Sequence, residues 1–335
     1  MKWLILPIVL VVSVSFSLSA WAGSAFPGGV LDSTGRTAFV AVEDGVEAVD
    51  LETGLSRWKS REATWPVLAA GDQLIALSVS RGSLLVVGLD LTGRGDRVFR
   101  SDPVEIPAWA DASSLRCNWT LEKRTLCLSW QARAPLGRSA GGTSSIDLVH
   151  ARVTKMKDNP NISSTIPRML EKLPVRWHRS IAGSVHAVVE EEAGPMSLFR
   201  RRSKLVLHVW SETTGKEARA QELIEGVRPM LLPGLEGLHV WVRDAGTFEN
   251  ATDGTGSAWQ VHSALDGQRV ARVPFVPGTV QATVLGSRAF GLATRSARVL
   301  VEGKAGRRHE LYAVDLESGK TLWRKAVREN AVSPR

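Results

Sequence analysis

The sequence predicts an all-β fold, and within that class a β-propeller of four-stranded blades. Two observations support this prediction. Short segments of alternating apolar and polar residues recur along the chain. A polar turn motif also recurs, with intervals of 39 and 52 residues between its glycines, which fit propeller blades better than a β-sandwich. We therefore predict six blades, with seven possible, in a ring closed by joining N- and C-terminal strands.

The composition agrees with one large folded domain. Of the 335 residues, 44% are hydrophobic and 23% are charged, which is enough apolar surface to offset chain entropy and exclude a disordered chain. Two cysteines are too few for a disulfide-stapled miniprotein. The 30 glycines and 15 prolines disfavour a helical bundle.

Residues 1–22 have the features of a secretory signal peptide. Lys2 supplies the positive charge, Trp3–Phe16 is an uncharged apolar core, and Ala20–Ala22 fits the small-x-small cleavage rule. The alternative is an uncleaved membrane anchor, but the apolar core is short for a span. We expect a mature propeller domain at 23–335 that is periplasmic or secreted, without a stable membrane span and without a nucleic-acid partner.

The turn motif is clearest near the two ends of the chain. Residues 46–58 and 311–323 both contain Ala-Val-Asp-Leu-Glu, a hydroxyl residue and Gly, and both end in Trp. An alternating strand precedes each turn, and Gly can adopt the positive φ that other residues resist. Partial copies lie between them. The residues that we expect to define the repeat are Asp50, Gly54, Trp58, Gly93, Gly215, Gly267, Asp315, Gly319 and Trp323.

The carboxylates of the motif have two possible roles. Asp50 and Asp315 could take part in catalysis, or they could brace the turn by accepting hydrogen bonds from its N–H groups. We interpret them as braces. Trp58 and Trp323 follow the turn at the same spacing, so they are expected to pack toward the next sheet.

Two blades can be divided into strands from the pattern alone. Their strands are expected at Trp65–Ala69, Gln73–Val79, Leu84–Leu89 and Arg97–Arg100, and at Thr279–Leu285, Arg288–Thr294, Glu310–Asp315 and Thr321–Lys325. The third and fourth blades are less regular. We expect them around Leu126–Trp130 with Ile146–Val153, and around Val185–Glu190 with Leu205–Trp210; Leu238–Val242 is a further strand. A poor copy of the turn ends at Gly142, and an inserted loop is expected at about 155–175.

Cys117 and Cys127 flank a nine-residue segment, Asn118–Leu126. Antiparallel strands folded about this segment could bring the two sulfur atoms together in an oxidising compartment, and a bridge would add about 2–3 kcal/mol in the chain-entropy model. The alternative is two buried thiols. Two cysteines and seven scattered histidines predict no closed metal site.

The sharpest charge cluster is Arg200, Arg201 and Arg202, and we expect it in a blade loop. Such a cluster is either a solvated loop that favours solubility or a basic rim for an acidic partner. It supplies the candidate partner-binding residues of the sequence.

The two terminal motifs, with Trp58 and Trp323, resemble the repeats of pyrroloquinoline-quinone-type β-propellers. This resemblance implies a quinoprotein-like propeller and not an activity, because the repeat is a packing motif. The enzymes of the family hold the quinone beside two adjacent cysteines and over a calcium ion, and this chain has no adjacent cysteines. It is more similar to non-enzymatic periplasmic members, such as the scaffold lipoprotein of outer-membrane β-barrel assembly, although it lacks a lipid-acceptor cysteine.

Two functions are compatible with these features. The first is an exported, non-catalytic scaffold that binds a protein or an envelope component, with no cofactor, metal or catalytic residue. The alternative is a small oxidoreductase of the quinoprotein type that depends on quinone and calcium.

Overall fold

The computed structural model describes residues 25–134, 137–155, 175–182, 185–196, 201–211, 213–214, 216–245, 258–295, 308–328 and 332–334. Residues 1–22, predicted to be a signal peptide, and nearly all of the inserted loop expected at about 155–175 lie outside these residues. So do Gly215 and Arg200.

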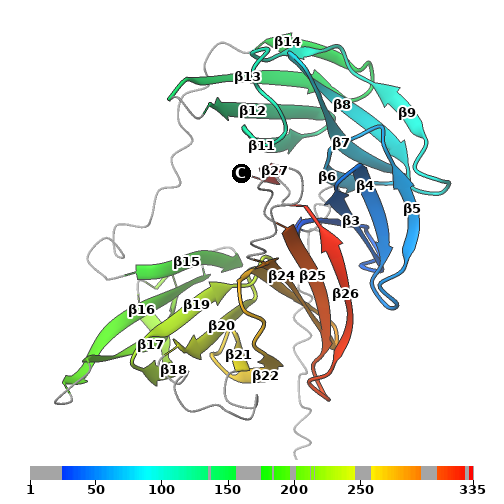
Figure 1. Cartoon of the computed structure of the whole chain (residues 1–335). Coiled ribbons are helices and arrows are strands. Elements are labelled where there is room, and N and C mark those ends of the chain that lie inside the picture. The colour runs from blue at the N-terminus through cyan, green and yellow to red at the C-terminus, as the bar shows by residue number, and fades with distance from the viewer. Residues whose placement is uncertain are drawn as a thin grey trace, which may run out of the picture.

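The described residues form strands and no α-helix, and the strands make six sheets in chain order (Figure 1). The first sheet contains β1 (Ala25–Phe26), β2 (Gly29–Leu31), β3 (Thr37–Val42), β4 (Gly45–Asp50) and β5 (Ser56–Ser60). The second contains β6 (Trp65–Ala70), β7 (Gln73–Ser80), β8 (Ser83–Asp90), β9 (Arg97–Arg100) and β10 (Val104–Glu105). The third contains β11 (Leu115–Glu122), β12 (Thr125–Arg133), β13 (Ser139–Asp147), β14 (Arg152–Lys155) and β27 (Val332–Pro334).

The last three sheets have four strands each. The fourth contains β15 (Val175–Ala182), β16 (Val185–Met196), β17 (Arg201–Ser211) and β18 (Lys216–Gly226). The fifth contains β19 (Pro229–Pro233), β20 (His239–Asp244), β21 (Ala258–Ser263) and β22 (Arg269–Pro274), and the sixth contains β23 (Thr279–Leu285), β24 (Arg288–Arg295), β25 (Arg308–Asp315) and β26 (Thr321–Val327). Six consecutive sheets that are antiparallel apart from the β11–β27 pair are the blades of a β-propeller, as predicted.

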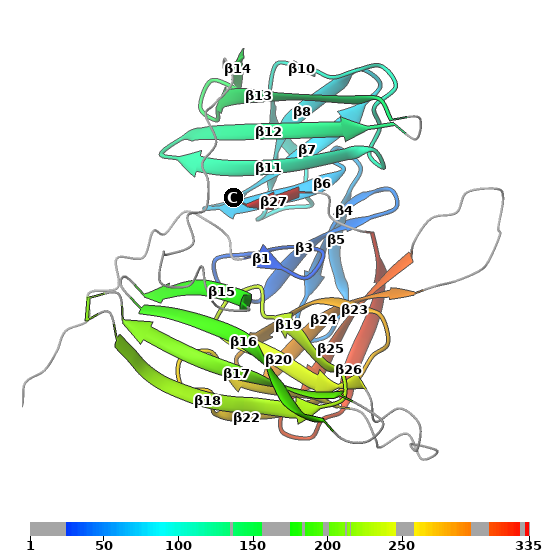
Figure 2. The ribbon, with the colours of Figure 1, turned by 90° about the vertical axis from the view of Figure 1, so that its left-hand side faces the viewer.

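Apolar side chains fill the spaces between neighbouring sheets. Separate buried clusters join the first sheet to the second, the second to the third, the fourth to the fifth, the fifth to the sixth, and the sixth back to the first. None of the clusters formed by described residues joins the third sheet to the fourth. Figure 2 shows these two sheets one above the other, on the side turned toward the viewer.

The first and sixth sheets of the chain pack against each other. The backbone N–H of Arg328 donates to the carbonyl of Ala41 at 2.8 Å, and Lys325 forms an ion pair with Glu47 at 2.8 Å. The chain then adds β27 to the inner edge of the third sheet, where it pairs with β11 in parallel (Figure 1). Among the described strands, none from the N-terminal end shares a sheet with one from the C-terminal end. The first and last sheets are joined by packing between them, and β27 pairs with a strand of the third sheet.

The strands predicted for the second and last blades are confirmed, with ends that differ by three residues or fewer. One strand of the third blade is wrong, because Ile146–Val153 is broken by a turn at 148–151 between β13 and β14. The Asp147 carboxylate accepts hydrogen bonds from the N–H groups of Val149 and His150, which bends the chain there.

Two predicted turn glycines lie elsewhere than expected. Gly142 is in the middle of β13. In the turn between β13 and β14, the residue with positive φ is Ala151 (φ 55°). In the second sheet, Gly95 (φ 73°) takes the positive φ instead of Gly93. The positive φ of the turn is therefore adopted by an alanine in the third sheet and by a glycine two positions later in the second. A search for glycine at a fixed spacing predicts neither turn correctly.

The possible bridge between Cys117 and Cys127 is absent, and both thiols are free. Cys117 pairs with Trp130 across β11 and β12, whereas Cys127 pairs with Thr120, three positions along the strand. Since side chains alternate between faces, an offset of three places the two thiols on opposite faces of the sheet. Cys117 is buried, which raises its pKa to about 12, and Cys127 is half-buried.

We therefore expect the two cysteines to react very differently. In the native protein, iodoacetamide should modify Cys127 and leave Cys117 unmodified, because a buried thiol with a raised pKa supplies almost no thiolate. Both should react once the chain is unfolded in concentrated guanidinium. Peptide mass mapping of the two states measures this, and a Cys117–Cys127 crosslinked peptide in the unreduced protein would contradict it.

Candidate functional site

The repeated turns are built around one side chain, as the sequence predicts. Asp50 Oδ1 accepts hydrogen bonds from the N–H groups of Glu52 and Thr53, both at 3.0 Å, and from the Thr53 hydroxyl at 3.1 Å. Asp315 accepts in the same way from the N–H and hydroxyl of Ser318. These contacts lower the pKa of Asp315, chiefly through the Ser318 hydroxyl. The carboxylates are turn braces.

The two repeat tryptophans connect neighbouring sheets. Trp323, on β26 of the sixth sheet, packs against Gly54 in the turn after β4, and its Nε1 donates to the Leu51 carbonyl at 3.2 Å. Trp58, on β5 of the first sheet, packs in the same way against Gly95 of the second. Each indole occupies the space that a Cβ atom would take at the turn of the neighbouring sheet. This contact explains why the turn residue is glycine, at Gly54 for Trp323 and at Gly95 for Trp58.

Other residues occupy the tryptophan position in the remaining sheets. Trp323 is cross-strand from Ala313, and the residues at the corresponding register are Phe99, Arg219 and Ala271 in the second, fourth and fifth sheets. Arg219 reaches the next turn by donating to the Asp266 carbonyl at 2.9 Å. Ala271 is too short, and the space around Gly319 is open. The tryptophan contact is therefore concentrated around the first sheet.

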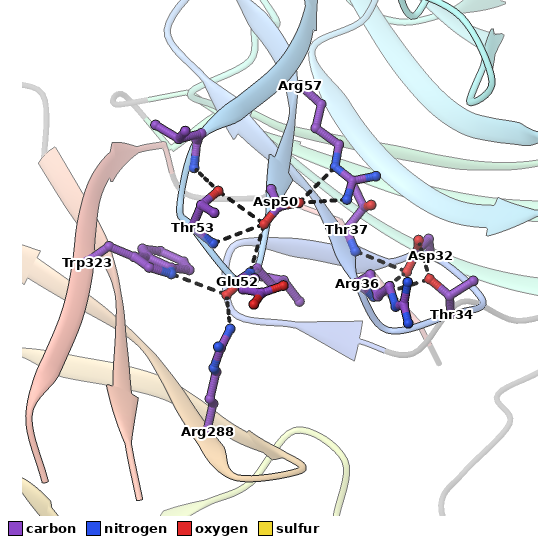
Figure 3. A network of polar contacts seen from close by, with 12 residues as sticks. Asp32, Thr34, Arg36, Thr37, Asp50, Glu52, Thr53, Arg57, Arg288 and Trp323 are labelled. Atoms are coloured by element: carbon purple, nitrogen blue, oxygen red, sulfur yellow. Dashed lines mark hydrogen bonds and ion pairs between the residues drawn. The ribbon is translucent and has the colours of Figure 1, made fainter. Parts of the chain in front are cut away.

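A pocket of about 490 Å³ lies beside this contact, between the first and sixth sheets. The turns after β2, β4 and β23 form its walls. Its charged lining consists of three arginines and two carboxylates: Arg36, Arg57, Arg288, Asp50 and Glu52. Figure 3 shows these side chains around the Asp50 turn.

Asp50 is the most strongly held charge of the pocket. Its Oδ2 accepts hydrogen bonds from Arg57 Nη2 at 2.6 Å and Arg57 Nε at 3.2 Å, in addition to the turn contacts at Oδ1 (Figure 3). The Arg57 guanidinium, followed by the Thr53 N–H, lowers the pKa of Asp50 to about 2. A carboxylate with this pKa is a weak proton acceptor at neutral pH, so it is suited to structure and not to general-base catalysis.

The other two arginines of the pocket form fewer hydrogen bonds than Arg57. Arg288 donates from Nη1 to the Leu51 carbonyl at 3.0 Å, the same oxygen that accepts from Trp323 (Figure 3). Arg36 is exposed, and its guanidinium makes no hydrogen bond to another described residue, although its backbone is fixed by Asp32 and Leu51. Because Arg57 is paired with Asp50, the charges that remain in the pocket are two guanidiniums, of Arg36 and Arg288, and one carboxylate, of Glu52. A carboxylate or phosphate group is the complementary ligand.

The other candidate residues of the sequence are not in this pocket. The expected loop position is wrong for Arg201 and Arg202, which begin strand β17 in the β16–β17 hairpin of the fourth sheet. Arg202 Nη1 lies 3.6 Å from Glu225 Oε1 on β18. Lys204 pairs with Glu222 at 3.1 Å, so acidic neighbours on β18 offset part of the basic run. Among the described residues, no group of three or more His, Cys, Asp or Glu has the arrangement needed for a metal ion. The described chain also contains no helix of the length and apolarity that crossing a bilayer requires.

Sequence reasoning missed most of the pocket. Arg36 and Arg288 belong to turns that carry no copy of the motif, and they approach Asp50 only because the first and sixth sheets are neighbours. Arg57 could have been found, since it immediately precedes the repeat tryptophan and lies seven residues after Asp50.

Comparisons with known proteins add only distant likenesses. No protein-family model matches the chain, and no curated protein matches it. Among solved structures, a putative TolB from Agrobacterium tumefaciens is 15% identical over 84% of this chain and 87% of its own, with a TM-score of 0.33. The Dos1 propeller is 10% identical over 88% and 69%, with a TM-score of 0.29. A eukaryotic initiation factor is 9% identical over 90% of this chain, with a TM-score of 0.26, and the chain spans 65% of its length. The sheet topology identifies the fold.

Proposed function

We propose that this protein is an exported, non-catalytic β-propeller that binds an acidic protein or another acidic envelope component. The pocket between the first and sixth sheets is its binding site. The observation that supports this proposal most directly is the Arg36 guanidinium, which is exposed at the pocket and has no acidic partner among the described residues. Residues 1–22 supply the export signal.

The chemistry of the pocket favours binding over catalysis. Its most perturbed carboxylate, Asp50, is held ionised by Arg57 and the turn N–H groups. Arg36 and Arg288 can each donate two parallel hydrogen bonds to a carboxylate or phosphate, a geometry that gives specificity. The basic run Arg200–Arg202 is proposed as a second, weaker contact for the same partner, because acidic residues offset part of its charge.

The test compares Arg36→Glu with Arg94→Glu in affinity capture from an envelope fraction. Arg94 is an exposed arginine in the turn of the second sheet, so its variant makes the same charge change away from the pocket. We expect Arg36→Glu to reduce the captured partner at least about tenfold, because it sets a negative charge against an acidic partner, and Arg94→Glu to leave the captured amount unchanged. Equal capture by both variants would remove the pocket from the proposal. Added quinone and calcium should give no dye reduction with the wild-type protein.

A further inference from the structure

The strand β27 differs from every other described strand in how it joins its sheet. It pairs with β11 in parallel, whereas all other pairings between described strands are antiparallel. Its residues follow the sixth sheet in the sequence, yet they lie in the third sheet, beside β6 of the second (Figure 2). The strand β11 pairs with β12 on one edge, and on its other edge it pairs with β27, a segment from a distant part of the chain.

The strand that receives it is held rigidly. All eight residues of β11 pair with β12, from Leu115 opposite Ala132 to Glu122 opposite Thr125. Leu115, Cys117 and Trp119 are buried in the cluster that joins the second and third sheets. Because β11 is fixed by its neighbour and by this cluster, its other edge presents backbone donors and acceptors in a preformed arrangement.

The segment β27 uses only part of this edge. Val332, Ser333 and Pro334 lie opposite Cys117, Asn118 and Trp119, which are three of the eight residues of β11. Thr120–Glu122 extend beyond the last paired position and have no second strand among the described residues. Pro334 also lacks a backbone N–H, so it can only accept. A longer extended segment without proline could make more ladder hydrogen bonds on the same edge.

We propose that the inner edge of β11 is an acceptor site for an extended segment of a partner protein, and that Val332–Pro334 occupies it in cis until the partner displaces it. The partner segment runs parallel to β11 and is recognised mainly through its backbone. The tail then acts as an intramolecular competitor, whose effective concentration is set by its short connection to the sixth sheet. This inference rests on the proposed function only in taking the partner to be a protein.

The test uses a fluorescein-labelled synthetic peptide of residues 329–335 and fluorescence anisotropy. Three proteins are compared: the full chain, a chain ending at Arg328, and a full-length variant with Val332→Pro and Ser333→Pro, which retains the tail but removes its N–H donors. We expect the shortened chain and the proline variant to bind the peptide at least about tenfold more tightly than the full chain, because the internal competitor is lost. Circular dichroism confirms that each variant is folded, and the proline variant serves if the shortened chain is not.

Peptides methylated on one backbone nitrogen show whether pairing is through the backbone. In a strand, successive N–H groups point to opposite edges, so only one of the N–H groups of Val332 and Ser333 faces β11. Methylation of that nitrogen should abolish binding, and methylation of the other nitrogen should leave binding unchanged. Equal binding by all three proteins, or equal binding of both methylated peptides, would overturn the proposal. A full-length dimer that disappears on truncation would also overturn it, by assigning the strand to a second copy. Arg36→Glu does not alter this edge, so failure of the pocket and failure of the edge are separate results.

Discussion

Replacing Gly54 with alanine is expected to lower the free energy of unfolding by about 3 kcal/mol. Gly54 has a φ of 72°, a region that costs an L-residue about 1–2 kcal/mol. A Cβ at this position would also lie 2.5 Å from Cγ and 3.0 Å from Cβ of Trp323. The backbone fixes the Trp323 Cβ, and its Cγ can move only by a change of χ1 that would take the whole indole out of its contact, so either this contact is lost or the sixth sheet shifts from the first. Urea denaturation followed by tryptophan fluorescence measures the change.

The matched control is Gly319→Ala in the sixth sheet. Gly319 stands at the same place in the repeat and has a φ of 68°, but a Cβ added there would meet no atom within 4 Å. It should therefore cost only the backbone term, about 1 kcal/mol. In a Trp323→Ala background, Gly54→Ala should fall to the same small value, because the clash is gone. Equal losses for the two glycines in the wild-type background would contradict the role given to Trp323.

Replacing Glu236 with alanine is expected to cost about 2–3 kcal/mol, because it leaves a buried hydroxyl without its acceptor. Glu236 lies between β19 and β20 in the fifth sheet and reaches the sixth, where its Oε2 accepts from the Thr283 hydroxyl at 2.5 Å. Its Oε1 accepts from His239 Nδ1 at 2.8 Å. Thr283 is only 1% exposed, so water cannot replace the lost contact. The backbone bond from Leu235 N–H to the Ala282 carbonyl, at 2.9 Å, marks the same junction.

A double-mutant cycle with Thr283→Val isolates this interaction. The coupling between Glu236→Ala and Thr283→Val should be about 1–3 kcal/mol, because Thr283→Val removes the hydroxyl that Glu236→Ala would leave unsatisfied. Glu317→Ala, in an exposed turn of the sixth sheet, is the control and should change stability by no more than about 0.5 kcal/mol. Independent effects at Glu236 and Thr283 would show that the contact does not hold the fifth and sixth sheets together.

Local pattern was enough to predict the strands of the second and last blades. In both, apolar residues alternate within short segments and the turns between them carry glycine or aspartate, so each strand is specified by its own residues. The bracing role of Asp50 and Asp315 was predictable for the same reason, since donor and acceptor lie within three residues of each other.

The pattern was insufficient where a turn does not depend on glycine. Ala151 adopts a φ of 55° in the third-sheet turn, and the Asp147 carboxylate bends the chain that leads to it. A search for the Asp-to-Gly spacing therefore placed the turn at Gly142, inside a strand. The possible disulfide between Cys117 and Cys127 was wrong for a related reason. Their separation allowed a bridge, but the strand register placed the thiols on opposite faces, and register is fixed by pairing along the whole hairpin.

The class of fold, the repeat unit and the chemistry of its turns could be predicted from the amino-acid sequence, because each depends on residues close together in the chain. The neighbours of each repeat could not, because they come from distant parts of the chain and depend on how the sheets pack. The tertiary structure set Trp323 against Gly54, gathered Arg36 and Arg288 around the Asp50 turn, and seated β27 on β11. Trp323 and Gly54 are 269 residues apart in the sequence, and β27 follows β11 by more than 200. Such neighbours are set by the packing of the first sheet against the sixth and by the pairing of β27 with β11, which no local pattern encodes.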